Sequence, residues 1–204
     1  MTDSYHLDEL KIALDPAHPG HSMPPAAAAD ARVLDVGCGA GQTLLAAYPE
    51  RRTFGMDIDL EALRLGRTLT QSVEFVCGRA EALPYRSAQF DIVVARVSLA
   101  YTNIGQSVAE IQRVLRPGGT VWMTLHPFSL YRDRIRSANW KGRVFLAYIV
   151  ANGLCFHFLA RQFRFRGQQE SFQTEAAMRR TLQRAGFKDI RVDRTRAFAV
   201  IAKV

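Results

Sequence analysis

The sequence predicts an α/β fold in which helices cover both faces of a mostly parallel sheet. Short apolar runs typical of buried strands alternate with amphipathic helical runs between residues 32 and 126. The first apolar run ends on Asp35 and passes directly into the turn Gly37-Cys38-Gly39-Ala40-Gly41. Glycines in such a turn let backbone amides approach a ligand closely, and open parallel sheets bind ligands at this edge.

Composition indicates one domain with a sizeable core, because 48% of the 204 residues are hydrophobic. The first nine residues are polar and acidic, unlike a secretory signal, so we expect a cytoplasmic protein. Cys38, Cys77 and Cys155 are scattered, and no two form a C-x-x-C pair. This spacing indicates reduced thiols and no metal site.

Residues 1–31 are expected to lie outside the main domain of residues 32–204. A helix is predicted from Ser4 to Leu14, followed by a connector with prolines at positions 16, 19, 24 and 25. Prolines at this density prevent a continuous helix or strand. We expect this segment to pack over the domain or to fray.

Residues 32–126 contain five strand candidates and two clear helices. The strands are expected at Arg32–Val36, Thr53–Asp57, Glu74–Cys77, Phe90–Ala95 and Thr120–His126. The helices are expected at Leu60–Thr70 and Val108–Leu115, where apolar residues recur at helical spacing. The sequence Arg116-Pro117-Gly118-Gly119 is expected to end the second helix and turn the chain into the fifth strand.

Residues 127–172 interrupt the alternation and are interpreted as an insertion that contacts the substrate or forms a lid. Its uncharged run, Val144–Ala160, has 17 residues, fewer than the ~20 needed to span a bilayer. We therefore expect a buried or lid-forming helical insertion. The chain then returns to the sheet with a helix at Thr174–Ala185 and strands at Ile190–Val192 and Ala197–Ala202.

Asp35 and Asp57, at the ends of the first and second strands, mark a ligand site. Asp57 ends the second strand twenty residues after Gly37, where a carboxylate can accept hydrogen bonds from ribose hydroxyls. The alternative, an N-cap for the following helix, is favoured for the neighbouring Asp59. Gln42 follows Gly41, so the G-x-G-x-x-G spacing of dinucleotide-binding turns is not met. A nicotinamide oxidoreductase is therefore the least favoured class.

Five motifs in the same order resemble the class I S-adenosylmethionine-dependent methyltransferases, specifically their small-molecule (type 11-like) branch. They are Val33 to Gly41, Gly55-Met56-Asp57, Ala80 to Tyr85, Phe90 to Val93 and Arg113 to Gly119. The resemblance covers residues 32–126. It implies a Rossmann-like, doubly wound, seven-stranded sheet with an antiparallel last strand, a helical insertion after the fifth strand, and S-adenosylmethionine as the cofactor.

The resemblance also implies roles for individual residues. It places Asp35 near the methionyl amino group and Asp57 at the ribose hydroxyls. The glycine turn lies against the methionine and ribose, through Gly37, Cys38, Gly39 and Gly41. At the other end, Ile58 is expected on one face of the adenine and Ala80 at its edge.

Two positions qualify this assignment. The family usually has Gly-Asp before the alanine, whereas this chain has Gly78-Arg79, and an arginine cannot accept a hydrogen bond from the adenine amino group. Either Glu81 or a backbone carbonyl is expected to replace the missing acceptor. Arg96 stands where the family often presents a main-chain carbonyl to the methionine end, although its guanidinium can alternatively hold a substrate anion.

Candidate catalytic residues follow the fourth and fifth strands. His126 is either a general base, with an unperturbed pKa of ~6.5, or a structural histidine before Pro127. Tyr101 either orients the acceptor or packs, and Tyr85 is expected to shape the pocket wall. Glu110 is better explained by an ion pair with Arg113 at three-residue spacing.

Much of the net charge of +8 lies in the insertion. There, eight basic residues stand against Asp133 and Glu170; the basic ones are Arg132, Arg134, Arg136, Lys141, Arg143, Arg161, Arg164 and Arg166. An anionic, partly apolar small-molecule substrate fits this segment, as does peripheral membrane contact through residues 143–166. The alternative is an apolar helix that completes the core or forms a homodimer contact.

The leading interpretation is therefore methyl transfer to a small molecule by in-line displacement. RNA methylation is a second hypothesis, but arginines and aromatics interleave only at Gln162–Arg166, and no Asn-Pro-Pro-Tyr type of motif follows the fourth strand. Nucleic acid is therefore not an expected partner. A third hypothesis is a non-catalytic cofactor-binding or membrane-associated protein.

Overall fold

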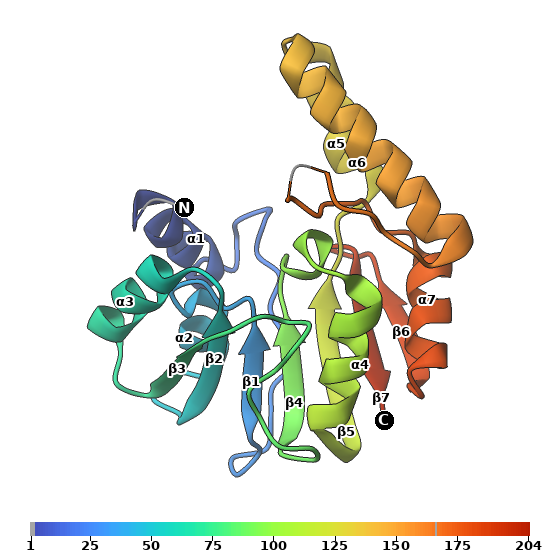
Figure 1. The fold of residues 1–204 in the computed structure, drawn as a ribbon. Helices are drawn as coiled ribbons and strands as arrows, with labels where there is room; N and C mark the ends of the chain where they lie inside the picture. The colour runs from blue at the N-terminus through green and yellow to red at the C-terminus, as the bar shows by residue number, and fades with distance from the viewer. Residues whose placement is uncertain (1–2, 166) are drawn as a thin grey trace.

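The computed structural model describes residues 3–165 and 167–204, and within them the chain forms one seven-stranded sheet (Figure 1). The strands are β1 (Val33–Val36), β2 (Thr53–Asp57), β3 (Val73–Cys77), β4 (Phe90–Ala95), β5 (Leu115–Thr124), β6 (Lys188–Asp193) and β7 (Ala199–Lys203). Their order is β3-β2-β1-β4-β5-β7-β6. The first five are parallel, and β7 is antiparallel to both β5 and β6. The doubly wound sheet with an antiparallel last strand is confirmed.

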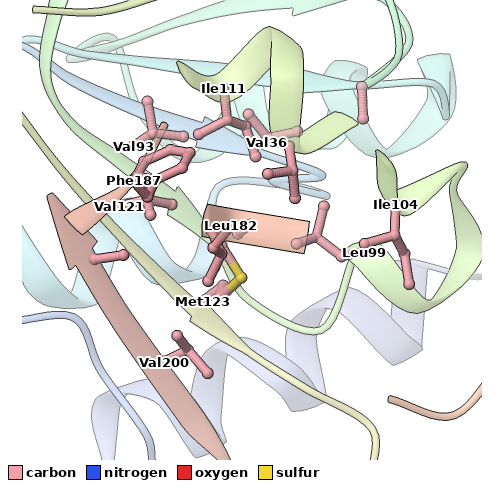
Figure 2. Packing of buried hydrophobic residues seen from close by; sticks show 14 of the residues in the cluster. Val36, Val93, Leu99, Ile104, Ile111, Val121, Met123, Leu182, Phe187 and Val200 are labelled. Atoms are coloured by element: carbon pink, nitrogen blue, oxygen red, sulfur yellow. The ribbon is translucent and has the colours of Figure 1, made fainter. Parts of the chain in front are cut away.

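Helices lie on both faces of this sheet and at its carboxyl edge. They are α1 (Asp3–Leu14), α2 (Gln42–Ala47), α3 (Leu60–Leu69), α4 (Ile104–Val114), α5 (Phe128–Ser137), α6 (Trp140–Leu159) and α7 (Glu175–Arg184), with a short 3-10 turn, η1, at Leu99–Tyr101. One apolar cluster packs α4 and α7 against the sheet, and Figure 2 shows its packing around Val93, Val121 and Met123. A second cluster packs α2 and α3 on the opposite face. Burial on both faces explains the continuous apolar runs of the parallel strands.

Capping side chains set where two helices begin. Asp59 accepts hydrogen bonds from the backbone N–H groups of Glu61 and Ala62, which confirms its N-cap role at α3. Asn103 caps α4 through Gln106 N, so this helix begins four residues before the predicted Val108. The expected pair between Glu110 and Arg113 is present at 2.7 Å.

Helix α2 follows the glycine turn directly. Two predictions for the fifth strand were wrong. Strand β5 begins at Leu115, which pairs with Phe90 before the register shifts, so the Pro-Gly-Gly sequence bends a strand instead of preceding one. The same strand ends at Thr124, which leaves His126 in the connection beyond it.

The insertion is helical, as expected, and contains two helices. Figure 1 shows α5 and α6 extending beyond the edge where the parallel strands end. Helix α6 has 20 residues, more than the uncharged run, and by length and composition it is long enough to cross a membrane. One third of its apolar window is buried inside the protein. Among the charged residues of the insertion, Arg166 and the side chains of Arg136 and Asp133 lie outside the described part of the structure.

A small core of its own holds the insertion together. Tyr131 from α5 packs with Leu146, Tyr148 and Ile149 from α6 and with Phe172. The buried Asn152 donates a hydrogen bond to the carbonyl of Glu170 and accepts one from the backbone N–H of Phe163. These contacts tie α6 to the segment that returns to the sheet, and this segment brings Glu170 towards the end of β5.

Candidate functional site

A cleft lies at the carboxyl ends of the parallel strands, which is the edge expected for a ligand. The end of β2 and the loops after β1, β2, β3 and β4 supply most of its lining, and α1 closes one side. The lining residues are Tyr5, His6, Glu9, Gly37, Cys38, Gly39, Gln42, Thr43, Met56, Asp57, Ile58, Asp59, Gly78, Arg79, Ala80, Glu81, Arg96, Val97, Ser98, Tyr101 and Thr102. Most of the sequence-predicted cofactor residues therefore meet in one place.

The glycine turn forms the floor of this cleft. Gly37 has a φ of +79°, and a Cβ built there would lie 2.2 Å from Ser98 Cβ, so a side chain is excluded. The backbone N–H groups of Gly37 and Cys38 both donate to the carbonyl of Met56, at 2.7 and 3.1 Å. These bonds fix the turn against β2.

Asp57 joins the turn to the next strand. Its Oδ2 accepts a hydrogen bond from Gly39 N at 2.7 Å, and its Oδ1 accepts one from Asp59 N at 2.9 Å. Each carboxylate oxygen can accept a second hydrogen bond. Asp57 lines the cleft, so these remaining acceptor positions suit two neighbouring hydroxyl groups, as the ribose prediction requires.

Asp35 is buried beneath the glycine turn, with 1% of its surface exposed. Neither of its carboxylate oxygens has a hydrogen-bond partner within the described residues. Burial raises the pKa of Asp35 to about 7, partly offset by Arg96 and reinforced by the charge of Asp57. A buried carboxyl without a partner is costly. It fits a site that a cationic group such as the methionyl ammonium completes, although Asp35 is not among the lining residues.

The far end of the cleft fits a flat apolar ring. Ile58 is largely exposed there and Ala80 lies at the wall. The carboxylate of Glu81 accepts a hydrogen bond from Asn103 N at 2.9 Å and lies 3.6 Å from Arg79 Nε. The expectation that Glu81 or a backbone carbonyl serves the adenine amino group stays a prediction.

Three expectations for site residues change. Gly41 is absent from the lining, and it instead starts α2 with a φ of +86° against Phe75, whose ring a Cβ would meet at 2.9 Å. Tyr85 packs edge-on against Phe54 and Phe90 in the core and does not shape the pocket wall. The guanidinium of Arg96 donates hydrogen bonds to Glu9 Oε2 and Thr43 Oγ1, both at 2.9 Å. These bonds occupy the group that was expected to hold a substrate anion.

Sequence reasoning missed the part that α1 takes in the site. Tyr5, His6 and Glu9 line the cleft, and the ring nitrogen Nδ1 of the buried His6 lies 2.9 Å from Gln42 Nε2. The ion pair between Glu9 and Arg96 holds this helix across the cleft. No local pattern could reveal these contacts, because they join residues 36 and 87 positions apart.

His126 and Tyr101 come together beside the cleft. Tyr101 lines it, and its ring packs edge-on against His126 at 5.6 Å between centroids. His126 is buried behind Tyr101 and does not itself line the cleft, so its role as a base stays a prediction. Burial, together with the charge of Arg134, lowers the pKa of His126 to about 4. The imidazole is therefore neutral near pH 7.

A buried network extends from the second side of His126. Its Nδ1 lies 3.1 Å from the hydroxyl of Tyr131, and Tyr131 is hydrogen-bonded in turn to Glu170. Because the hydroxyl of Tyr131 donates its proton to Glu170, it accepts a hydrogen bond from His126 Nδ1–H. The neutral imidazole of His126 then carries its lone pair on Nε2. Burial raises the pKa of both Tyr131 and Glu170. Neither residue was singled out from the sequence as a site residue.

Comparison with known proteins matches residues 34–123 to the family model described as a methyltransferase domain. A malonyl-[acyl-carrier protein] O-methyltransferase from Pseudescherichia vulneris is 33% identical over 98 residues, 46% of this chain and 38% of that protein. A phthiotriol/phenolphthiotriol dimycocerosates methyltransferase from Mycobacterium leprae is 37% identical over 95 residues, 43% of this chain and 35% of that protein. The matched part thus spans less than half the length of these curated relatives.

Solved structures agree on the fold. A SAM-dependent methyltransferase from Thermotoga maritima, described as a possible histamine N-methyltransferase, superposes with a TM-score of 0.62 at 16% identity. The match covers 98% of this chain and 87% of that one. This superposition shows the fold, and the family model and the relatives agree with the resemblance to methyltransferases.

Proposed function

We propose that this chain, whose residues 34–123 match a methyltransferase domain, moves a methyl group from S-adenosylmethionine to a small-molecule acceptor by in-line displacement. One observation carries the proposal: the buried, unpartnered carboxyl of Asp35 lies beneath a glycine turn that Asp57 fixes at the sheet edge. This arrangement supports cofactor residues Asp35, Gly37, Cys38, Gly39, Asp57, Ile58, Ala80 and Glu81, with Arg96 contributing through its backbone.

We infer that the acceptor is anionic and partly apolar and that it enters beside Tyr101. Val97, Tyr101 and Thr102 give this end of the cleft an amphipathic surface. The charge of Arg134 reaches Tyr101 and lowers its pKa, against the larger effect of burial, which raises that pKa to about 12. Residues 127–172, which supply Arg134, are then the substrate segment. Malonyl and dimycocerosate groups appear in the names of two relatives, which supports an acyl-type acceptor.

The chain's own groups have separate tasks in this reaction. When bound, S-adenosylmethionine supplies an electrophilic methyl group. Tyr101 keeps its proton at neutral pH, so its phenol can orient the acceptor by donating a hydrogen bond. Helix α1 covers the cleft and excludes water, which favours displacement because it desolvates the attacking atom.

We further propose that His126 accepts the acceptor's proton through Nε2, positioned by Tyr131 and Glu170. The neutral state of the imidazole near pH 7 is required for this role. The low pKa of His126 makes it a weak base. We therefore expect it to accelerate the reaction by a factor at the lower end of the usual range for general base catalysis, about 10²–10⁴. Alignment and desolvation supply the remainder of the rate.

The proposed function is tested in two steps. Isothermal titration should detect S-adenosylmethionine binding, and cofactor carrying a labelled methyl group should transfer that label to a small molecule in a metabolite extract. Binding without transfer to any fraction would support a non-catalytic protein. Label in RNA, with steep salt dependence of RNA binding, would support RNA methylation instead. Absence of S-adenosylmethionine binding would overturn all three hypotheses: small-molecule methylation, RNA methylation and a non-catalytic cofactor-binding protein. The expected cytoplasmic location stays a prediction.

Replacing His126 by Asn should lower the rate of methyl transfer about 100-fold, the lower end of general base catalysis. The cofactor affinity should not change, because His126 lies outside the cleft lining. Tyr131→Phe removes the hydrogen-bond partner of Nδ1 and should lower the rate about tenfold, a modest loss for a positioning residue. Single-turnover rates and titration of the cofactor separate the two effects.

The pH profile adds a second readout for the same role. A base whose pKa is about 4 is deprotonated throughout pH 6–9, so the wild-type rate should be independent of His126 ionisation there. The rate should fall below about pH 5, as the imidazole gains a proton. A His126→Asn variant that keeps the wild-type rate and the same acid limb would assign His126 a purely structural role.

A further inference from the structure

The outer face of α6 carries a continuous apolar stripe. The opposite face is buried in the protein through residues such as Ile149, Gly153 and Phe156. Trp140 and Phe158 at the two ends are 72% and 73% exposed. All the members of the stripe are exposed: Trp140, Val144, Ala147, Ala151, Leu154 and Phe158. No charged residue lies between Val144 and Leu159.

The spacing along this stripe is that of a helix–helix seam. Successive members are four, three, four, three and four residues apart, an average equal to the ~3.6 residues of one helical turn, so the stripe runs straight along one side of α6 and can face a neighbouring helix. The stripe is about 27 Å long, because each helical residue rises 1.5 Å. The outer face of α6 is thus patterned for a second helix along most of its length.

The stripe is also self-complementary, since it reads alike from both ends. Its members lie in pairs at equal distances from position 149: Trp140 with Phe158, Val144 with Leu154, and Ala147 with Ala151. We propose that α6 packs antiparallel against α6 of a second copy of this chain, about a two-fold axis at the level of residue 149. Such an isologous contact sets each residue opposite the other member of its pair.

Charge placement supports the antiparallel direction. Lys141 and Arg143 lie in the first turn of α6, where the positive end of the helix dipole disfavours cations. In an antiparallel pair, the carboxyl end of the partner's α6, with its free carbonyl groups, lies beside this turn. In the dimer these two cations therefore lie beside the negative end of a second helix dipole, which favours them.

A second copy explains the stripe better than a membrane surface does. Alanines at the centre add little apolar area to a lipid contact, but they let two helices approach closely. The nearest basic residues lie at the ends of α6, whereas helices that rest on a bilayer usually carry Lys and Arg along the polar face. A single helix pair is small for a protein interface, so we expect a dissociation constant of about 10 µM.

Sedimentation velocity between about 1 and 100 µM should show a monomer–dimer equilibrium in the wild-type chain. Ala147→Glu and Ala151→Lys should each give monomers, because each single change places like charges near the two-fold axis. The double variant should dimerise again, since the carboxylate at position 147 then faces the ammonium at position 151 of the partner. Ala176→Glu, at an exposed alanine of α7, is the matched control and should dimerise like the wild type.

Three results would overturn the proposal. A wild-type chain that stays monomeric at about 100 µM would exclude the dimer at the affinity expected for this interface. A double variant that remains monomeric while the singles are folded would exclude antiparallel pairing about residue 149. Binding of the wild-type chain to phosphatidylglycerol vesicles, lost equally in the singles and the double, would assign the stripe to a membrane.

Discussion

Replacing Asp57 by Ala should weaken S-adenosylmethionine binding about 1000-fold. Two hydrogen bonds from ribose hydroxyls to a charged acceptor contribute about 1.5–3 kcal/mol each, and about 1.4 kcal/mol corresponds to a factor of ten. The same carboxylate holds the N–H groups of Gly39 and Asp59, so the variant also loosens the glycine turn. Isothermal titration measures the loss directly.

A milder variant and a control make this result interpretable. Asp57→Asn keeps the shape and one acceptor oxygen, and we expect it to lose about 30-fold, near a single charge-assisted hydrogen bond. Glu61→Ala removes a carboxylate from the first turn of α3 that pairs with Arg64 at the surface and does not line the cleft, so its cofactor affinity should equal that of the wild type. Wild-type affinity in a folded Asp57→Ala would contradict the ribose role.

The sheet could be predicted from the sequence because its signals are local. Strands buried in the middle of the sheet, such as β1 and β4, are short and mostly apolar, and Asp59 marks the start of α3 by its own cap. The errors arose where tertiary pairing overrides a local signal. Pro117 and Gly118 indicate a turn, yet the pairing of Leu115 with Phe90 extends β5 through them.

The sequence predicted residues of the cleft lining only where a motif lies at the end of a strand. Gly37 and Asp57 lie at strand ends, and the parallel topology brings these ends together. Gly41 looked equivalent to its neighbours, but its conformation serves the contact with Phe75. The cover that α1 forms depends on the pair of Glu9 with Arg96, and the network at His126 depends on Tyr131 and Glu170 from the insertion. These contacts are non-local, so no spacing encodes them.

The folded chain should lose stability between about pH 5 and pH 8 because of Asp35. Its pKa is about 7 in the folded state, against 3.8 for an exposed aspartate, so folding favours the protonated carboxyl. The stabilising contribution is complete below pH 3.8 and is lost as the pH rises through about 7, where the ionised carboxylate is buried. Since one pKa unit equals about 1.36 kcal/mol, we expect a loss of about 2–3 kcal/mol over this window.

Asp35→Asn should remove this pH dependence while it weakens cofactor binding. Urea unfolding at pH 5 and pH 8 measures this effect. The unfolding free energy of the variant minus that of the wild type should be about 2–3 kcal/mol larger at pH 8 than at pH 5. A difference that is the same at both pH values would contradict the buried ionisation.

The affinity for S-adenosylmethionine should depend on the same ionisation with the opposite sign. In the proposed site the methionyl ammonium pairs with the ionised carboxyl of Asp35. The wild-type affinity should therefore rise about tenfold between pH 6 and pH 8, and binding should release a proton below pH 7. The Asn variant should bind about 100-fold more weakly at pH 8, without this slope. The ionised carboxylate of Asp35 thus destabilises the cofactor-free chain at the same pH at which it binds the cofactor most tightly. Asp35 therefore lowers the stability of the free chain and raises its affinity for S-adenosylmethionine.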